Sequence, residues 1–271
     1  MIVNTEQYTQ HTLSIRLSAD GFSFSVTSCT DKESFQYETL RIQPNISLTA
    51  NIKQFLYPNE LLQRQFKNSN ILIDTPHYTT VPFELFEDEQ AEAIYYHCHP
   101  QRPGEKVLYN ILDRCNIVVL FAIDKSTYSL LKELYPQARI FASISPVIEH
   151  LAGKSRIGNN CKTFLHLGRR TTDFLVFDHG HPLLINTFAT QGSNDCSYYA
   201  LNIWEKLKLN QEHDELYIIG NQPHKEEVAE ELRSYIKSVS ILNPTAEFNR
   251  SAAASNSEVT YDLLSLLHTN L

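Results

Sequence analysis

The sequence has no run of the ~18–20 apolar residues that a helix needs to cross a membrane. Its first residues, MIVNTEQYTQHTLS, lack both the basic and the apolar stretch of a secretory signal peptide. Lysine and arginine number 23 against 31 aspartates and glutamates, so no basic surface is expected to neutralise the phosphates of a nucleic acid. These absences predict a cytoplasmic protein with no membrane span and no nucleic-acid partner.

Cysteine is scarce, odd in number and without a CxxC pair. This pattern suits reduced thiols in a cytosolic protein better than a disulfide framework. We expect each thiol to pack as a small apolar side chain, at Cys29, Cys98, Cys115, Cys161 and Cys196.

The run His97-Cys98-His99 contains two residue types that bind zinc. Both histidines would share a face if the segment were a strand. However, no second pair lies at finger spacing and Pro100 ends the run, so the end of a helix is the favoured interpretation and no metal is expected.

Several nucleotide-binding and hydrolase motifs are also missing. The sequence contains no GxxxxGK[ST], no GxGxxG and no GxSxG. With 271 residues, 42% of them hydrophobic and 20% charged, the chain is long enough for one large or two modest globular domains.

Two halves of the chain show the same order of elements: a hairpin, a third strand, a helix, a strand and a helix. The hydrophobic patterns predict α/β domains at residues 1–152 and 153–271, each with a mixed sheet and helices packed on it. In the first half the expected strands are 12–17, 22–28, 35–42, 71–74, 106–112, 117–123 and 138–142, and the expected helices are 51–65, 86–96, 124–134 and 146–152. In the second half the expected strands are 163–167, 172–177, 183–188, 215–219 and 239–242, the expected helices are 195–207, 225–236 and 259–268, and 243–257 is expected to be a loop.

The most informative stretch is TFLHLGRRTTDFLVFDHGHPLLINTF, residues 163–188, which predicts three consecutive strands, the first two joined by the turn Gly168-Arg169-Arg170-Thr171. Such a turn offers backbone N–H groups and hydroxyls to an anion. Within it, HLGRRTTDFLVF resembles the second phosphate motif of the actin-like ATPase superfamily, which includes actin, sugar kinases and heat-shock chaperone ATPases. The residues that fall on that motif are Gly168, Thr171, Thr172 and Asp173.

Two further glycines agree with this resemblance. Gly192 stands in a turn before a helix, similar to the turn that follows the third strand in the superfamily. Gly220 ends an apolar strand before a helix, as in the adenosine motif, although the other glycines of that motif are missing. In layout the chain is most similar to bacterial pilus-assembly and cell-division actin homologues, and to a bacterial family of unknown function with this fold. The resemblance implies two ribonuclease H-like domains with a cleft between them, lined by 18–21, 168–172 and Gly220.

The chain departs from the superfamily at the residues that would hold magnesium. In the first hairpin, Arg16 replaces the motif's aspartate and Ser18 its glycine; in the second, His166 replaces the aspartate. Magnesium prefers hard oxygen ligands, and neither a guanidinium nor an imidazole supplies them. Without the metal, phosphoryl transfer loses its main charge stabiliser, so ATP hydrolysis by the superfamily mechanism is not expected.

Two interpretations of these positions stay open. Basic side chains could form a metal-free site that binds a phosphate or a nucleotide weakly. Alternatively, Arg16 pairs with a nearby carboxylate and the turn arginines are solvated, which is the favoured interpretation. The candidate anion-binding residues are Arg16, Ser18, Asp20, Gly21, His166, Gly168, Arg169, Thr171, Thr172, Gly192 and Gly220.

Two functions from different classes follow. The first is a non-catalytic actin-like protein that acts as a scaffold or adaptor for a protein partner whose identity the sequence does not reveal. The second is a nucleotide-dependent enzyme, an ATPase or a small-molecule kinase, in which Asp20 and Asp173 are the only carboxylates expected near the two turns. Aromatic doublets such as Tyr198-Tyr199 fit either a packed core or a protein-binding surface.

Overall fold

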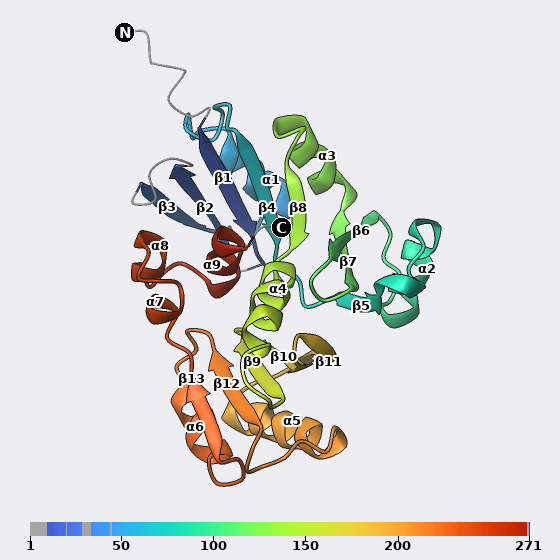
Figure 1. The fold of residues 1–271 in the computed structure, drawn as a ribbon. Helices are drawn as coiled ribbons and strands as arrows, with labels where there is room; N and C mark the ends of the chain where they lie inside the picture. Colours follow the sequence, from blue (N-terminus) through green and yellow to red (C-terminus); the bar gives the residue numbers. More distant parts are fainter. Residues whose placement is uncertain (1–9, 20, 29–33, 44, 270) are drawn as a thin grey trace. The chain divides into compact units, whose positions relative to one another are not determined.

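The fold is described by a computed structural model that covers residues 10–19, 21–28, 34–43, 45–269 and 271. The chain divides into two compact units, each discontinuous in sequence (Figure 1). The first unit comprises Met1–Ile111, Val118–Ser145 and Arg250–Val259. The second unit comprises Leu112–Ile117, Pro146–Asn249 and Thr260–Leu271.

The first unit contains a five-stranded sheet in the order β3-β2-β1-β4-β8. Strands β1, β2 and β3 pair antiparallel, whereas β4 is parallel to both β1 and β8. All five strands were expected, the first two from their alternation of apolar and polar residues and the fourth as a buried apolar run. Their bounds are β1 His11–Leu17, β2 Gly21–Ser28, β3 Phe35–Arg41, β4 Asn68–Ile73 and β8 Arg139–Ala142.

Two helices of this unit illustrate how local signals set helix ends. In α3, Lys125–Leu134, the side chain of Asp124 accepts from the backbone N–H of Thr127, as its position before the helix predicted. Helix α1, Leu48–Leu56, is shorter than the expected 51–65 because Pro58 follows it, and a proline has no backbone N–H with which to continue the helix.

A second, three-stranded sheet of the first unit has the order β5-β7-β6. Strand β5 was not expected, and the expected helix 86–96 begins only at Ala91 because two short 3-10 helices precede it. The bounds are β5 Tyr78–Pro82, η2 Phe83–Leu85, η3 Asp88–Gln90, α2 Ala91–Cys98, β6 Glu105–Leu112 and β7 Ile117–Asp124.

The second unit contains a five-stranded sheet in the order β11-β10-β9-β12-β13. Strands β9, β10 and β11 pair antiparallel, and β12 is parallel to both β9 and β13. Buried side chains of the strands pack against those of two helices, among them Trp204 and Val228. The bounds are β9 Lys162–Leu167, β10 Thr171–Asp178, β11 His181–Ala189, α5 Ser193–Lys206, β12 Glu215–Ile219, α6 Lys225–Leu232 and β13 Ser238–Ile241.

Residues 243–257, expected to be a loop, contain two short helices, α7 Pro244–Glu247 and α8 Ala252–Ser255. Hydrophobic burial explains the difference. Phe248 is 1% exposed, and its ring centroid lies 4.7 Å from that of His150 and 5.4 Å from that of Tyr261. Phe248, which directly follows α7, thereby packs against side chains of α4, Ile144–Ser155, and α9, Tyr261–His268.

The two five-stranded sheets share one topology. On one side of the central strand, successive strands pair antiparallel; on the other side, successive strands pair parallel. The chain therefore has the expected α/β architecture of two ribonuclease H-like sheets with packed helices. Among the helices of the described residues, none has the length and apolar character that crossing a membrane requires.

Candidate functional site

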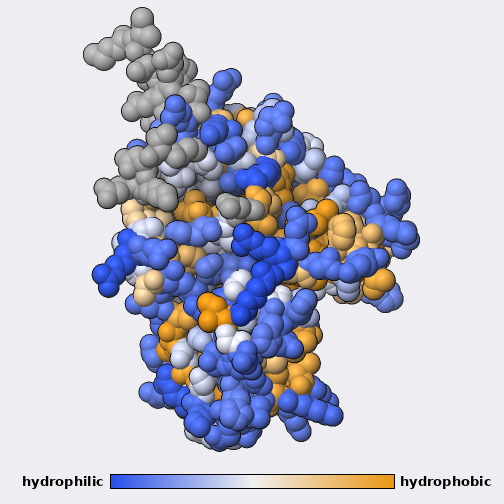
Figure 2. Space-filling view, viewed as in Figure 1, coloured by the Kyte–Doolittle hydropathy of each residue, from blue (hydrophilic) through white to orange (hydrophobic). Residues whose placement is uncertain are grey.

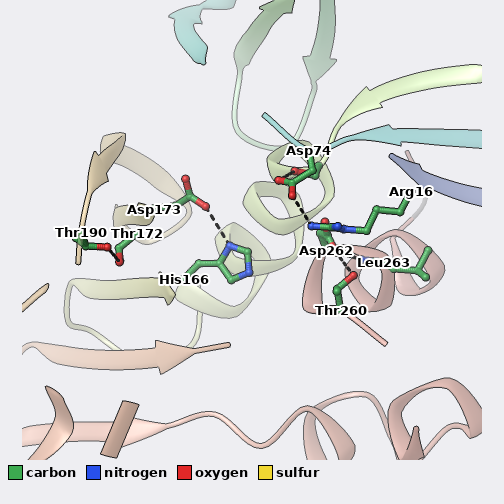
Figure 3. A network of polar contacts seen from close by, with 10 residues as sticks. Arg16, Asp74, His166, Thr172, Asp173, Thr190, Thr260, Asp262 and Leu263 are labelled. Carbon is green, nitrogen blue, oxygen red and sulfur yellow. Dashed lines mark hydrogen bonds and ion pairs between the residues drawn. The ribbon is translucent and has the colours of Figure 1, made fainter. Parts of the chain in front are cut away.

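Arg16 is the penultimate residue of β1, next to the first hairpin. Its Nη2 atom lies 2.8 Å from Oδ2 of Asp74, the residue that follows β4 (Figure 3). The backbone N–H of Asp74 donates to the carbonyl of Leu17 at 2.9 Å, and Ser143 Oγ donates to Asp74 Oδ1 at 3.3 Å. The arginine therefore pairs with a carboxylate that backbone and side-chain contacts hold in place.

His166 has the corresponding position in the second unit, as the penultimate residue of β9. Across the antiparallel pair it stands opposite Asp173 on β10, and its Nδ1 lies 3.1 Å from Asp173 Oδ2 (Figure 3). Its ring centroid lies 6.0 Å from that of Tyr261. Each five-stranded sheet thus carries a basic side chain and an aspartate together at the end of its central strand.

The first hairpin closes through its backbone. Ser18 N–H donates to the carbonyl of Gly21 at 3.0 Å, and Gly21 N–H donates back to Ser18 at 3.4 Å. A Cβ atom at Gly21 would lie 2.9 Å from the carbonyl oxygen of Leu40, so a glycine is required there. Asp20, the candidate carboxylate of this turn, lies outside the described residues.

The second hairpin also uses several of the donors that an anion would need. Gly168 N–H donates to the carbonyl of Thr171 at 2.8 Å, while Arg169 is exposed at the tip. The hydroxyl of Thr172 lies 3.0 Å from that of Thr190 (Figure 3) and 3.4 Å from the sulfur of Cys196. The anion site stays a prediction. The Gly168 N–H and the Thr172 hydroxyl already have hydrogen-bond partners within the protein, which compete with an anion for them.

The two remaining glycines differ in their surroundings. Gly192 is the N-cap of α5 and has an extended backbone with open space around it. Gly220 follows β12 with φ of +119°, and a Cβ there would lie 2.6 Å from the carbonyl oxygen of Leu167. Only glycine fits at position 220, next to the strand that carries His166.

Asp74 corrects the expectation that Asp20 and Asp173 are the only carboxylates near the two turns. Its distance to Arg16 brings a third carboxylate to the end of β1. A sequence signal for it exists, because Asp74 directly follows the parallel strand β4. Functional residues in α/β sheets collect at the carboxyl ends of parallel strands.

The described residues contain no group of three or more His, Cys, Asp or Glu side chains arranged to hold a metal ion. His99 follows α2, and its Nε2 lies 2.9 Å from Thr79 Oγ1 and 3.1 Å from the carbonyl of Tyr78. These contacts fit the end of a helix. Cys98 is exposed, so the expectation that it packs as a buried apolar side chain is wrong.

Cys196 is buried beside the second hairpin and behaves as a packed thiol. Burial raises its pKa, which keeps the sulfur protonated and a poor nucleophile at neutral pH. No cysteine nucleophile is therefore indicated at this position.

A buried carboxylate cluster lies behind His166 in the second unit and was not expected from the sequence. Oε1 of Glu247 lies 2.9 Å from His150 Nε2 and 3.2 Å from Lys154 Nζ, and the ring centroid of Tyr261 lies 6.0 Å from that of His150. Burial opposes the charged form, but the His150 hydrogen bond and the Lys154 charge hold the pKa of Glu247 below its usual value. The cluster ties α7 to α4 and α9.

The two sheets and the hairpins at the ends of their central strands define an actin-like ATPase fold. A crystal structure of a Bacteroides thetaiotaomicron protein with this fold and unknown function is 38% identical, with a TM-score of 0.87 over 99% of this chain and 100% of that one. Residues 2–239 match the family described as protein of unknown function, DUF3822, and the chain belongs to that family.

More distant similarity extends to pilus proteins. The structure described as the PilM-PilN type IV pilus biogenesis complex is 12% identical, with a TM-score of 0.56 over 94% of this chain and 96% of that one. At this identity the similarity concerns the fold. None of the curated proteins matches the sequence.

Proposed function

We propose that this protein is a non-catalytic member of the actin-like fold that acts in the cytoplasm as a scaffold or adaptor for another protein. The observation that carries the proposal is the pairing of Arg16 with Asp74 and of His166 with Asp173. At both hairpins a basic side chain stands in place of the carboxylate of the superfamily motif and pairs with an aspartate.

This arrangement disfavours magnesium for an electrostatic reason. The cation takes oxygen ligands, whereas each of these aspartates already interacts with a basic side chain at about 3 Å. A divalent cation near Arg16 would also meet a permanent positive charge. Phosphoryl transfer would then proceed without the metal that stabilises its transition state.

Use of the fold for protein binding has a parallel. PilM, which shares the fold, was solved in a complex with PilN. By analogy, this chain would work through a protein contact, and its partner need not be related to PilN.

A calorimetric titration with ATP, with and without magnesium, tests the proposal together with a phosphate-release assay. We expect no magnesium-dependent binding and no turnover above background. Robust turnover that is abolished in Asp173→Ala and kept in Asp178→Asn would contradict the proposal.

The alternative function is a nucleotide-dependent enzyme, an ATPase or a small-molecule kinase. The observation in its favour is Asp74, a carboxylate at the end of a parallel strand beside the first hairpin. An enzyme would use it to hold magnesium directly or through water. In that case Asp74→Asn would abolish turnover that the wild type displays.

A further inference from the structure

The three-stranded sheet of the first unit has one face that its helix covers only in part. Ala91 and Tyr95 of α2 pack there against Val118 and Leu120 of β7. Side chains at the margin complete this small core: Val81, Phe86, Ile94, Tyr96, Val107 and Ala122. The helix is only eight residues long, and a helix rises less per residue than a strand, so α2 does not cover the full length of β6 and β7.

Strand β6 shows where the cover ends. Alternate residues of a strand point to the same face, so Tyr109 and Ile111 share the face of Val107. Val107 packs into the core, whereas Tyr109 is 36% exposed and Ile111 is 43% exposed. The apolar face of β6 therefore continues into solvent.

The segment before α2 extends this apolar surface. Phe83 is 45% exposed and Leu85 is 72% exposed. They connect to β6 through Phe86, whose ring centroid lies 4.9 Å from that of Tyr109 and whose N–H donates to the Phe83 carbonyl at 3.1 Å. Figure 2 shows hydrophobic atoms among hydrophilic ones over the part of the molecule that contains β5, β6, β7 and α2. We call Phe83, Leu85, Tyr109 and Ile111 the β6 surface.

Acidic residues border the β6 surface. Glu84, Glu87, Asp88 and Glu89 are all exposed, and no lysine or arginine occurs between residues 83 and 92. The acidic and apolar groups lie close together, because the Asp88 carboxylate raises the pKa of Tyr109, with a contribution from burial. Lys106 alternates with Val107 and Tyr109 along β6 and so points to the other face, where its Nζ lies 4.1 Å from the centre of the Tyr128 ring.

From this combination we propose that the β6 surface binds a short segment of another protein in which apolar side chains alternate with lysine or arginine. The apolar side chains would cover Leu85 and Tyr109, and the basic ones would meet the acidic border. The small size of the surface suits a short segment better than a large, permanent interface.

The same charges disfavour two other occupants. A two-fold contact between two copies of this chain would bring identical carboxylates together. An anionic membrane surface would be repelled by them as well. Complementary charge therefore points to a basic peptide segment.

This inference rests on the proposed function, since it locates the protein contact of the scaffold. A fluorescence anisotropy titration of the full chain tests it, with a synthetic peptide of about ten residues that alternates leucine with lysine. We expect binding that weakens as salt is added, because salt screens the acidic border. A matched peptide with glutamate in place of lysine is expected not to bind.

Two pairs of variants localise the binding. Leu85→Ser is expected to weaken it roughly tenfold, whereas Ile157→Ser, which changes an equally exposed side chain of the second unit, leaves it unchanged. The double change Glu87→Gln with Glu89→Gln is expected to reduce the salt dependence. Glu226→Gln with Glu227→Gln removes two exposed carboxylates of α6 and should have little effect.

Hydrogen exchange supplies the second readout, with protection on peptide binding expected in β6 and in residues 81–89. Absence of binding, or binding that Leu85→Ser leaves intact, overturns the proposal. The proposal is also overturned if the wild type self-associates, or binds anionic phospholipid vesicles, and Leu85→Ser abolishes that behaviour. ATP turnover in a protein that still binds the peptide would refute the proposed function but would not contradict peptide binding at the β6 surface.

Discussion

His166 and Asp173 face each other across the antiparallel pair β9–β10, with Nδ1 and Oδ2 3.1 Å apart. The aspartate that follows the threonines of the hairpin therefore points to the same face as the histidine. The pair is partly exposed, since 20% of the His166 side chain and 18% of the Asp173 side chain reach solvent. A carboxylate next to the imidazole reduces the positive potential that an anion would meet there.

Removal of that carboxylate is expected to increase anion affinity. We predict that Asp173→Asn binds sulfate or ATP without magnesium more tightly than the wild type does, by severalfold at low salt, because the variant lacks one negative charge beside His166. Isothermal titration calorimetry measures the effect. Asp178→Asn is the matched control, since it removes the carboxylate of another Asp–His pair at the opposite end of β10. Equal affinities in all three proteins would contradict the prediction.

The glycine after β12 is expected to be intolerant of a side chain. Gly220→Ala should lower the free energy of unfolding by about 2 kcal/mol, because a Cβ would meet the Leu167 carbonyl and φ of +119° is strained for alanine. Gly153→Ala, in open space within α4, should instead raise it by about 0.5–1 kcal/mol through helix propensity. Urea denaturation checks both, and similar values for the two variants would be inconsistent with this geometry.

The Glu247 cluster is expected to make stability depend on acid pH. The folded state lowers the pKa of Glu247 from its usual 4.5, so its stabilisation is complete above that value and is lost as the pH falls through the lower folded value. Glu247→Gln should cost about 2 kcal/mol at pH 7 through loss of the charged contacts with His150 and Lys154. The difference in unfolding free energy between the variant and the wild type should disappear in strong acid, because Glu247 is then protonated and as neutral as glutamine.

Denaturant unfolding at several pH values measures that gap. Glu226→Gln, in an exposed position of α6, is the control and should stay close to wild type throughout. A gap for Glu247→Gln that widens on acidification would show that the carboxylate is not held in its charged form.

Thiol reactivity is expected to follow burial. Cys98 is exposed and should be alkylated by iodoacetamide before Cys115 and Cys196, because burial raises the pKa of Cys115 to about 12 and also raises that of Cys196. These two should be modified only after unfolding, because the thiolate is the reactive form. Peptide mass spectrometry over a time course resolves the sites. Labelling of Cys196 in the native protein as fast as Cys98 would rule out the packed position.

Elements whose signals are local were predicted well from the sequence. Strand β12 has the expected bounds, and Asp124 caps α3 as expected, because a cap depends on residues three positions apart. The C-terminal end of the expected helix 51–65 and the expected loop at 243–257 were wrong. Pro58 limits the first, and burial of Phe248 among residues distant in sequence orders the second.

The sequence by itself determined the two-sheet α/β fold and the replacement of both motif carboxylates by Arg16 and His166, because strand alternation and turn residues are local properties. Only the tertiary structure decided which groups these side chains meet. The Arg16–Asp74 contact joins residues 58 positions apart, and the His150–Glu247 contact joins residues 97 positions apart. Such pairs depend on strand order and helix packing, and hydrophobic periodicity carries no information about which side chains those arrangements bring together.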